Sequence, residues 1–214
     1  TDYIKISGND KFTLKSMLEI EPGKFIQKTT SFSANDYILD QNITLQNMES
    51  FIPARGYNLN WAEGIRYQEH NSVDESNDAH AIISANDLIE EVNADKVEPV
   101  EKTVTGDITY LAIKTKYFGT AIMPQGKFKG EVQVKGTHII AKNKGIIEKY
   151  YATMNIPYNG GNISNDFKIF IGPLKYDLVK TYGLEEMINL GWRYGIRQIG
   201  EYFMLPILNF TYSM

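Results

Sequence analysis

The sequence contains no cysteine. Disulfide bonds, a thiolate nucleophile and cysteine-ligated zinc are therefore excluded. The compartment is not fixed by this absence, because a large β domain can be stable in an oxidising space without covalent cross-links. The three histidines, His70, His80 and His138, show no metal-ligand spacing. We therefore expect no metal site, no catalytic site and no cofactor.

Long hydrophobic runs are also missing. No stretch reaches the roughly 18 consecutive apolar residues that a membrane-spanning helix needs. Residues Thr1 to Ile20 lack the apolar run of a signal peptide. Net charge is −4 with acids and bases interspersed, which argues against nucleic-acid binding. The strongly apolar tail from Ile199 to Met214 indicates a chain trimmed from a longer protein.

The residues that are present favour sheet. Hydrophobic residues make up 43% of the chain, enough for a folded core, and 14 tyrosines suit pleated, half-buried surfaces. Lys11 to Ile20 alternates apolar and polar residues, and Glu21-Pro22-Gly23 forms a turn. The segments Phe25 to Phe32 and Tyr37 to Leu45 then continue a meander.

Further strands follow along the chain. Ile108 to Met123 is apolar on both faces and predicts a buried strand pair that turns near Thr115-Lys116 or Gly119. Asp87 to Val92 reads as a strand or one helical turn, and Asn71 to Asp78 as a solvated acidic loop. Other predicted strands are Ala79–Ser84, Glu131–Val134, His138–Ala141, Ile146–Ile156 and Phe167–Ile171. Roughly a dozen short strands at this spacing predict a β-sandwich.

The hydrophobic period changes at Gly172-Pro173. Pro173 suits the first position of a helix, where its missing N–H needs no partner. Glu185 and Glu186 open a second helix, and a third begins at Arg193. We thus expect a β domain over residues 1–171 and a helical segment over residues 172–214. The residues predicted to dock these helices are Leu174, Leu178, Tyr182, Met187 and Ile188.

Three segments together resemble a known family. They are FKIFIGPLKYDLVKTYGLEEMINLGW at residues 167–192, TTSFSANDYILD at residues 29–40 and KYFGTAIMP at residues 116–124. The first resembles the segment that closes the large periplasmic domain of YidC-type membrane protein insertases, and the others resemble its early hairpin and central strand. Tyr110 stands where that family would have a tryptophan.

The resemblance implies a mainly β fold, a large twisted β-sandwich (a mutarotase-like supersandwich), followed by two or three α-helices. It implies a non-enzymatic, protein-docking domain on the periplasmic side of the bacterial inner membrane, in an insertase and chaperone that assists membrane protein insertion and folding. The implied partners are nascent membrane proteins, accessory subunits of the secretion translocon and, through the C-terminal segment, the lipid bilayer. Expected membrane-proximal residues are Trp192, Arg193, Arg197, Tyr202, Phe203, Leu205, Ile207 and Phe210.

A carbohydrate-binding or sugar-epimerising sandwich is the alternative. It would show a cleft with stacked aromatic side chains and a Glu–His pair for acid–base chemistry. Trp61 either lines such a groove for a peptide or sugar, or fills the core. Fold alone does not decide between these functions.

Overall fold

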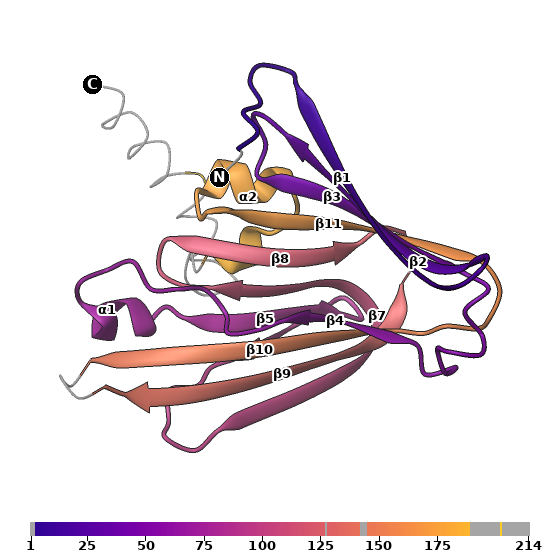
Figure 1. Cartoon of the computed structure of the whole chain (residues 1–214). Coiled ribbons are helices and arrows are strands. Elements are labelled where there is room, and N and C mark those ends of the chain that lie inside the picture. Colours follow the sequence, from indigo (N-terminus) through magenta and orange to yellow (C-terminus); the bar gives the residue numbers. More distant parts are fainter. Residues whose placement is uncertain (1–2, 127, 142–144, 189–201, 203–214) are drawn as a thin grey trace. The chain divides into compact units, whose positions relative to one another are not determined.

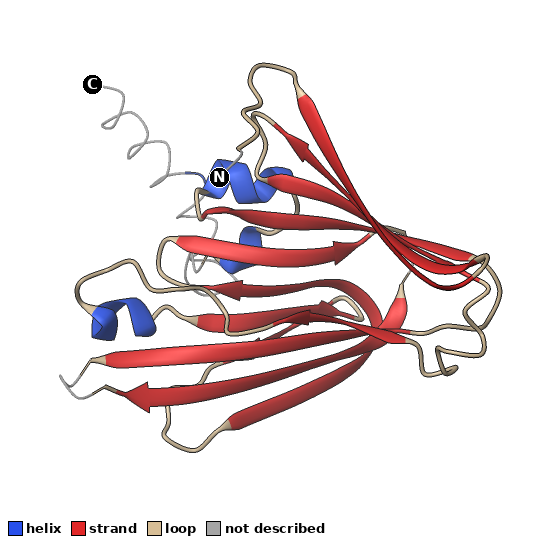
Figure 2. Cartoon of the chain, viewed as in Figure 1, coloured by secondary structure: helices blue, strands red, loops and turns tan. Residues whose placement is uncertain are grey.

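The computed structural model describes residues 3–126, 128–141, 145–188 and 202. The chain divides into two compact units, Thr1–Pro173 and Leu174–Met214, which are taken separately below. The fold is mainly β, as predicted (Figures 1 and 2). In chain order the strands are β1 (Lys11–Glu21), β2 (Lys24–Ser33), β3 (Ile38–Gln46), β4 (Tyr57–Trp61), β5 (His80–Ala85), β6 (Leu88–Val92), β7 (Val100–Lys114), β8 (Phe118–Pro124), β9 (Lys129–Ile140), β10 (Ile146–Ile156) and β11 (Ile163–Pro173).

All strand pairs of the first unit are antiparallel, and β7 divides the sheet into two sections. Residues Val100–Asp107 of β7 pair with β9, and the small section continues through β10 to β4. Residues Ile108–Lys114 pair with β5 and β8, and the large section runs through β11, β3 and β2 to β1, with β6 beside β5. One strand therefore belongs to both sections.

A glycine marks the point where β7 passes between the sections. Gly106 has φ +148°, and a Cβ there would lie 2.1 Å from Oδ1 of Asn86. The Asn86 side chain brackets this backbone, because Oδ1 accepts from Asp107 N at 3.0 Å and Nδ2 donates to Thr105 O at 3.2 Å. Asn86 and Asp87 form the β5–β6 turn, both with positive φ. Of the two readings of residues 87–92, the strand is therefore correct.

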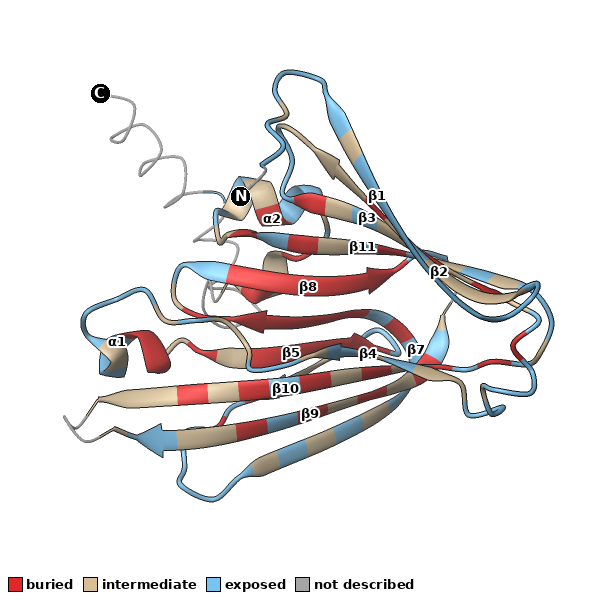
Figure 3. Cartoon of the chain, viewed as in Figure 1, coloured by how far each residue is buried: buried red, intermediate tan, exposed pale blue. Residues whose placement is uncertain are grey.

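The hydrophobic core joins the two sections. Its buried residues come from both and form one cluster, so the sections face each other across it (Figure 3). The alternation along β10, in which every second side chain from Glu148 to Ile156 is buried, fits a strand with one face on this core. Representative members are Ile83, Leu111, Ile122 and Phe167 from the large section, and Val132, Val134, Tyr150 and Met154 from the small one.

The prediction that residues 108–123 form a buried strand pair is confirmed. β7 and β8 turn through Thr115–Tyr117, and Thr115 N donates to Phe118 O at 2.8 Å. Most side chains on either side of this turn are buried, whichever face they occupy. Tyr110 is one of them, at 3% exposed.

Two predicted boundaries are wrong: Gly136 lies within a strand, and Pro173 is the last residue of one. Gly136 does not separate two strands, since β9 runs unbroken through it. A Cβ at Gly136 would lie 2.9 Å from Ala94 Cβ and 3.0 Å from Tyr150 Cε1, so close packing requires glycine. Pro173 does not open a helix; it ends β11, opposite Phe118.

The acidic segment 71–78 also differs from its prediction. It contains a short helix, α1 (Ser72–Ser76), capped by Asn71, whose side chain accepts from Asp74 N. Glu75 is fully buried and Ser76 nearly so. A buried carboxylate needs partners, and Glu75 Oε2 accepts from the backbone N–H groups of Gln68 and Glu69, both at 2.8 Å. The segment is therefore part of the packed structure.

The second unit contains α2 (Tyr176–Thr181) and a 3₁₀ turn, η1 (Glu185–Met187). The predicted second helix is thus only a single 3₁₀ turn in the described residues, and the predicted third helix lies outside them. Lys180 O accepts from the N–H of Gly183, which has φ +70° and ends α2 as predicted. Among the described residues, no helix has the length and apolar content needed to cross a bilayer.

Candidate functional site

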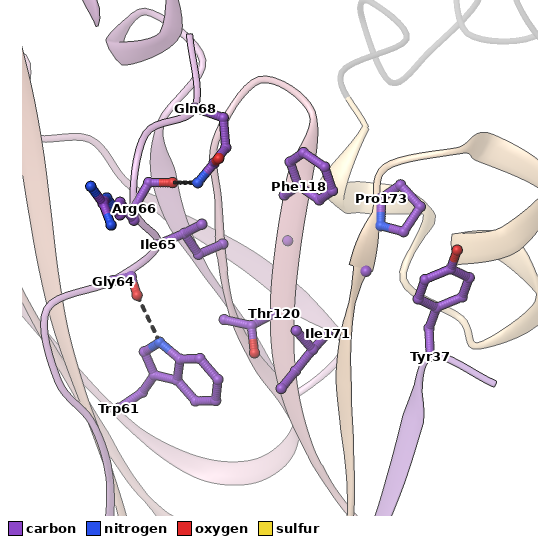
Figure 4. Close-up of a pocket in the computed structure, with 12 residues that line it drawn as sticks. Tyr37, Trp61, Gly64, Ile65, Arg66, Gln68, Phe118, Thr120, Ile171 and Pro173 are labelled. Carbon is purple, nitrogen blue, oxygen red and sulfur yellow. Dashed lines mark hydrogen bonds between the residues drawn. The ribbon is translucent and has the colours of Figure 1, made fainter. Parts of the chain in front are cut away.

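The first unit has an apolar groove of about 600 Å³ (Figure 4). It is formed by segments that are distant in the sequence: the paired ends of β8 and β11, Tyr37, and β4 with its following loop. Several large apolar side chains at it remain exposed to solvent: Tyr37, Phe118 and Ile171 are 46%, 42% and 48% exposed. The lining residues are Tyr37, Trp61, Gly64, Ile65, Arg66, Gln68, Phe118, Gly119, Thr120, Ile171, Gly172 and Pro173.

One wall comes from the ends of β8 and β11. Thr120 pairs with Ile171, and Phe118 pairs with Pro173. Strand alternation puts these four side chains on the same face of β8 and β11 as Ile122, which belongs to the core. The groove wall is therefore an outward continuation of the core-facing surface. Tyr37 lies beside this wall, where its carbonyl accepts from Ile171 N at 2.9 Å.

The opposite wall comes from Trp61, the last residue of β4, and the loop after it. Nε1 of the indole donates to Gly64 O at 3.0 Å, which fixes the ring (Figure 4). Trp61 is half-buried, packs against the core cluster and lines the groove. Trp61 therefore lines a groove and also packs against the core, while a peptide or sugar ligand for this groove stays a prediction. Glu75 holds the end of the same loop through the N–H groups of Gln68 and Glu69.

Polar groups in the groove are few. Thr120 is only 3% exposed, and its Oγ1 has no hydrogen-bond partner within the described part of the chain. Arg66 and Gln68 are exposed, and Gln68 Nε2 donates to Arg66 O at 3.1 Å. An apolar site with a buried hydroxyl and a cationic rim suits an apolar ligand that also offers a hydrogen-bond acceptor. Sequence patterns gave no sign of Thr120, because its surroundings come from distant strands.

A second cluster lies on the core-facing side of β9 and β10. The Tyr150 hydroxyl accepts from Ala94 N at 3.0 Å, and lies 2.9 Å from Ala79 O and 2.6 Å from Glu148 Oε2. His138 Nδ1 lies 3.1 Å from Ala94 O and 3.7 Å from Glu148 Oε1. These contacts link β9 and β10 to the segments around Ala79 and Ala94.

The surroundings of Glu148 shift its pKa in opposite directions. Burial raises its pKa, while the bonds to Tyr150 and His138 lower it. A phenol has one proton and cannot donate to Ala79 O and Glu148 together. The single phenol proton is therefore shared between these two acceptors.

The Glu–His pair does not line the groove at Trp61. Glu148 lines a neighbouring cavity of about 470 Å³ together with Tyr67 and Lys149, and this cavity shares Gly64, Ile65 and Arg66 with the groove. The carbohydrate alternative would instead place the Glu–His pair in one cleft with stacked aromatic side chains. In the described residues, no group of three or more His, Asp or Glu side chains is placed to hold a metal ion.

Most of the predicted membrane-proximal residues lie outside the described part of the chain. These are Trp192, Arg193, Arg197, Phe203, Leu205, Ile207 and Phe210. Tyr202 is described and is 77% exposed.

The predicted docking residues are all described. Met187 is fully buried, and the others, Leu174, Leu178, Tyr182 and Ile188, are half-buried. Val179 and Leu184 are fully buried, but the four-residue spacing did not identify them as docking residues. Leu184 N donates to Val179 O at 2.9 Å, which folds the turn after α2 back onto the helix. The docking role of these residues stays a prediction.

The fold and groove define a mainly β domain with an apolar surface groove. A family model described as the YidC periplasmic domain matches residues 1–199, and the chain belongs to this family.

Similar proteins include the membrane protein insertase YidC of Chlorobaculum tepidum, 30% identical over 95% of this chain and 35% of that protein. The insertases of the same name from Chloroherpeton thalassium and Chlorobium limicola are 29% and 30% identical over 96% and 94% of this chain, and over 36% and 35% of their own lengths. The chain thus spans about a third of the length of the curated relatives it matches.

Proposed function

We propose that this chain is the extracytoplasmic docking domain of a bacterial inner-membrane insertase. Membership of the YidC periplasmic domain family supports the setting, and the apolar groove supports the docking role. The domain would act by binding rather than catalysis. Its expected partners are nascent membrane proteins and accessory subunits of the secretion translocon.

The groove is the observation that carries this proposal. Its exposed aromatic and aliphatic side chains suit an apolar peptide segment, since such anchors supply most of the binding energy at protein interfaces. Thr120 would donate its hydroxyl to a peptide carbonyl at the base of the groove. Arg66, exposed at the rim, would favour a segment with an acidic flank.

Two finer features belong to the same proposal. The two sections, packed on one core, would form the twisted supersandwich known from mutarotases, with a β domain over residues 1–171. The segment 172–214 would connect this domain to the bilayer, with its aromatic residues at the lipid interface. A sugar-modifying role has less support, because the Glu–His pair does not line the aromatic groove.

The groove is tested by titrating a fluorescent apolar peptide, taken from a membrane segment of an inner-membrane protein, with the 214-residue chain. Trp61→Ala and Phe118→Ser should each weaken binding roughly tenfold or more, as expected for aromatic anchors. Tyr151→Ser is the matched control, since Tyr151 is 41% exposed on the outer face of β10 and does not line the groove. Equal affinity in all three variants would refute groove binding.

The division of labour between the units is tested by deletions in a full-length insertase that carries this domain. Loss of residues 1–165 should be tolerated better than loss of residues 173–205, because the latter would connect the domain to the membrane. The readout is insertion of a membrane protein client in cells depleted of the native insertase. The opposite ranking would contradict the proposal.

A further inference from the structure

Strand β1 is a long sheet edge with no partner on its outer side among the described residues. It pairs with β2 over its length and forms one end of the strand order (Figure 1). Ten of its 11 residues are exposed, all except Phe12. An unprotected edge presents a row of unpaired N–H and C=O groups to any strand that can align with it.

Large apolar side chains remain exposed on this edge. Leu14, Met17 and Leu18 are 48%, 61% and 60% exposed, and the strand is long and contains no proline, so it lacks two of the features that normally protect an edge. The cross-strand neighbours of Leu14 and Leu18 on β2 are Thr30 and Ile26. Leu14 and Leu18 lie on one face of the strand, separated by Ser16, and so form an uncovered apolar row.

Charge is distributed along the same strand in two blocks. Lys11 and Lys15 lie in its first half, and neither has an ion pair or side-chain hydrogen bond in the described structure. Glu19 and Glu21 lie in its second half. Glu21 pairs with Lys24 at 2.7 Å, and Glu19 Oε1 accepts from Gly23 N at 3.0 Å. Both of these contacts lie at the exposed turn between β1 and β2.

When two copies of β1 run in opposite directions, the basic half of one strand lies beside the acidic half of the other. If two β1 strands align antiparallel about Ser16, Leu14 of each copy lies opposite Leu18 of the other. In the same register Thr13 lies opposite Glu19, which places Lys15 one diagonal step from Glu19. A parallel alignment would instead set like charges against each other.

We propose that β1 is a homodimerisation edge, and that its partner is β1 of a second copy of this chain. The two copies are related by a two-fold axis near Ser16, so the same surface is used on both sides. Backbone hydrogen bonds join the two sheets, while the leucine rows and the opposed charge blocks fix direction and register. The interface is small, which makes the dimer reversible.

The dimer is tested by analytical ultracentrifugation of the 214-residue chain. We expect the weight-average mass to rise from 24.4 kDa toward twice that value between about 10 µM and about 1 mM, in the range expected for a small interface. Lys11→Glu with Lys15→Glu should weaken self-association roughly tenfold or more, because each copy then presents only acidic charges. Glu19→Lys with Glu21→Lys should do the same with basic charges.

Mixing the two charge-reversed variants restores opposite charges across the edge, which distinguishes dimerisation through β1 from dimerisation through another surface. An equimolar mixture of the acidic-edge and basic-edge variants should form a heterodimer at concentrations where each alone is monomeric. Lys129→Glu with Lys168→Glu is the matched control, because it makes the same change in net charge at exposed positions outside β1. Thermal unfolding establishes that each variant is folded. A monomeric wild type at about 1 mM, a dimer insensitive to both edge variants, or a mixture that stays monomeric would each overturn the proposal.

Discussion

The hydroxyl of Tyr150 lies 2.6 Å from Oε2 of Glu148, two residues earlier on the same core-facing side of β10. The same hydroxyl accepts from Ala94 N and contacts Ala79 O. One phenol oxygen therefore links β10 to the segments on both sides of the β5–β6 hairpin. Burial and the neighbouring carboxylate raise the pKa of Tyr150, so the phenol remains protonated.

Tyr150→Phe should destabilise the fold by about 2 kcal/mol or more, because it leaves the buried Ala94 N–H and the Glu148 carboxyl without this partner. The measurement is the free energy of unfolding from guanidinium denaturation. Tyr151→Phe is the matched control, since Tyr151 is exposed and faces outward; it should change stability by less than about 0.5 kcal/mol. Similar values for the two variants would mean that the Tyr150 network contributes little.

Stability should fall as pH decreases from 6.5 toward 4, in part because of His80. Burial, and then the positive charge of Lys114, lower the pKa of His80 from 6.5 to about 4. Within this window the unfolded chain binds a proton that the folded protein does not, so acid favours unfolding. The stability that depends on neutral His80 is fully present above about pH 6.5 and is lost as pH falls toward 4.

His80→Gln removes this titration, so the stability difference between wild type and variant should narrow as pH falls through the same window. Unfolding free energies measured at several pH values give this difference directly. His70→Gln, at an exposed position in the preceding loop, should keep the wild-type dependence. A difference between wild type and His80→Gln that is independent of pH would contradict the assignment.

Gly106→Ala should destabilise the protein by about 3 kcal/mol or more, because it combines an unfavourable φ with a clash against Asn86. Gly23→Ala isolates the backbone effect, since Gly23 has φ +75° and a Cβ added there would meet nothing within 4 Å, and should cost about 1 kcal/mol. Adding Asn86→Ala to Gly106→Ala should recover part of the loss. A double variant with fully additive effects would show that the clash with Asn86 is unimportant.

Thr120→Val should leave the unfolding free energy unchanged or raise it by up to about 1 kcal/mol, because the buried hydroxyl has no partner in the described structure. The same change should weaken binding of an apolar peptide in the groove. Thr153→Val provides the contrast, since Thr153 Oγ1 donates to Asn60 Oδ1 at 3.0 Å and its loss should destabilise. Clear destabilisation by Thr120→Val would show that the hydroxyl has a structural role.

The sequence was most informative where hydrophobic pattern and turn residues agree. The strands predicted at Lys11–Ile20 and Tyr37–Leu45 correspond closely to β1 and β3. It misled at Gly136, because glycine often interrupts a strand, and at Pro173, because proline suits the first position of a helix; only three-dimensional contacts explain their places here. The burial of Glu75 was equally invisible, since its partners are backbone N–H groups of another segment.

One wall of the groove was partly predictable, because groove lining was one of the two roles considered for Trp61 from the sequence. The other wall was not. Thr120 and Ile171 become neighbours only through the pairing of β8 with β11, which no local pattern specifies. The strand order of the whole sheet determines which side chains at a strand end face the core and where the core ends.

The passage of β7 through both sections has a mechanical consequence. A force that pulls the two sections apart does not act on a loosely connected boundary, because the single strand β7 is hydrogen-bonded in both sections. Hydrogen bonds along one half of that strand would have to shear first, and their loss would open the common hydrophobic cluster to water. Loss of the hydrogen bonds in either half of β7 should therefore lead to their loss in the other half, so that the first unit unfolds cooperatively.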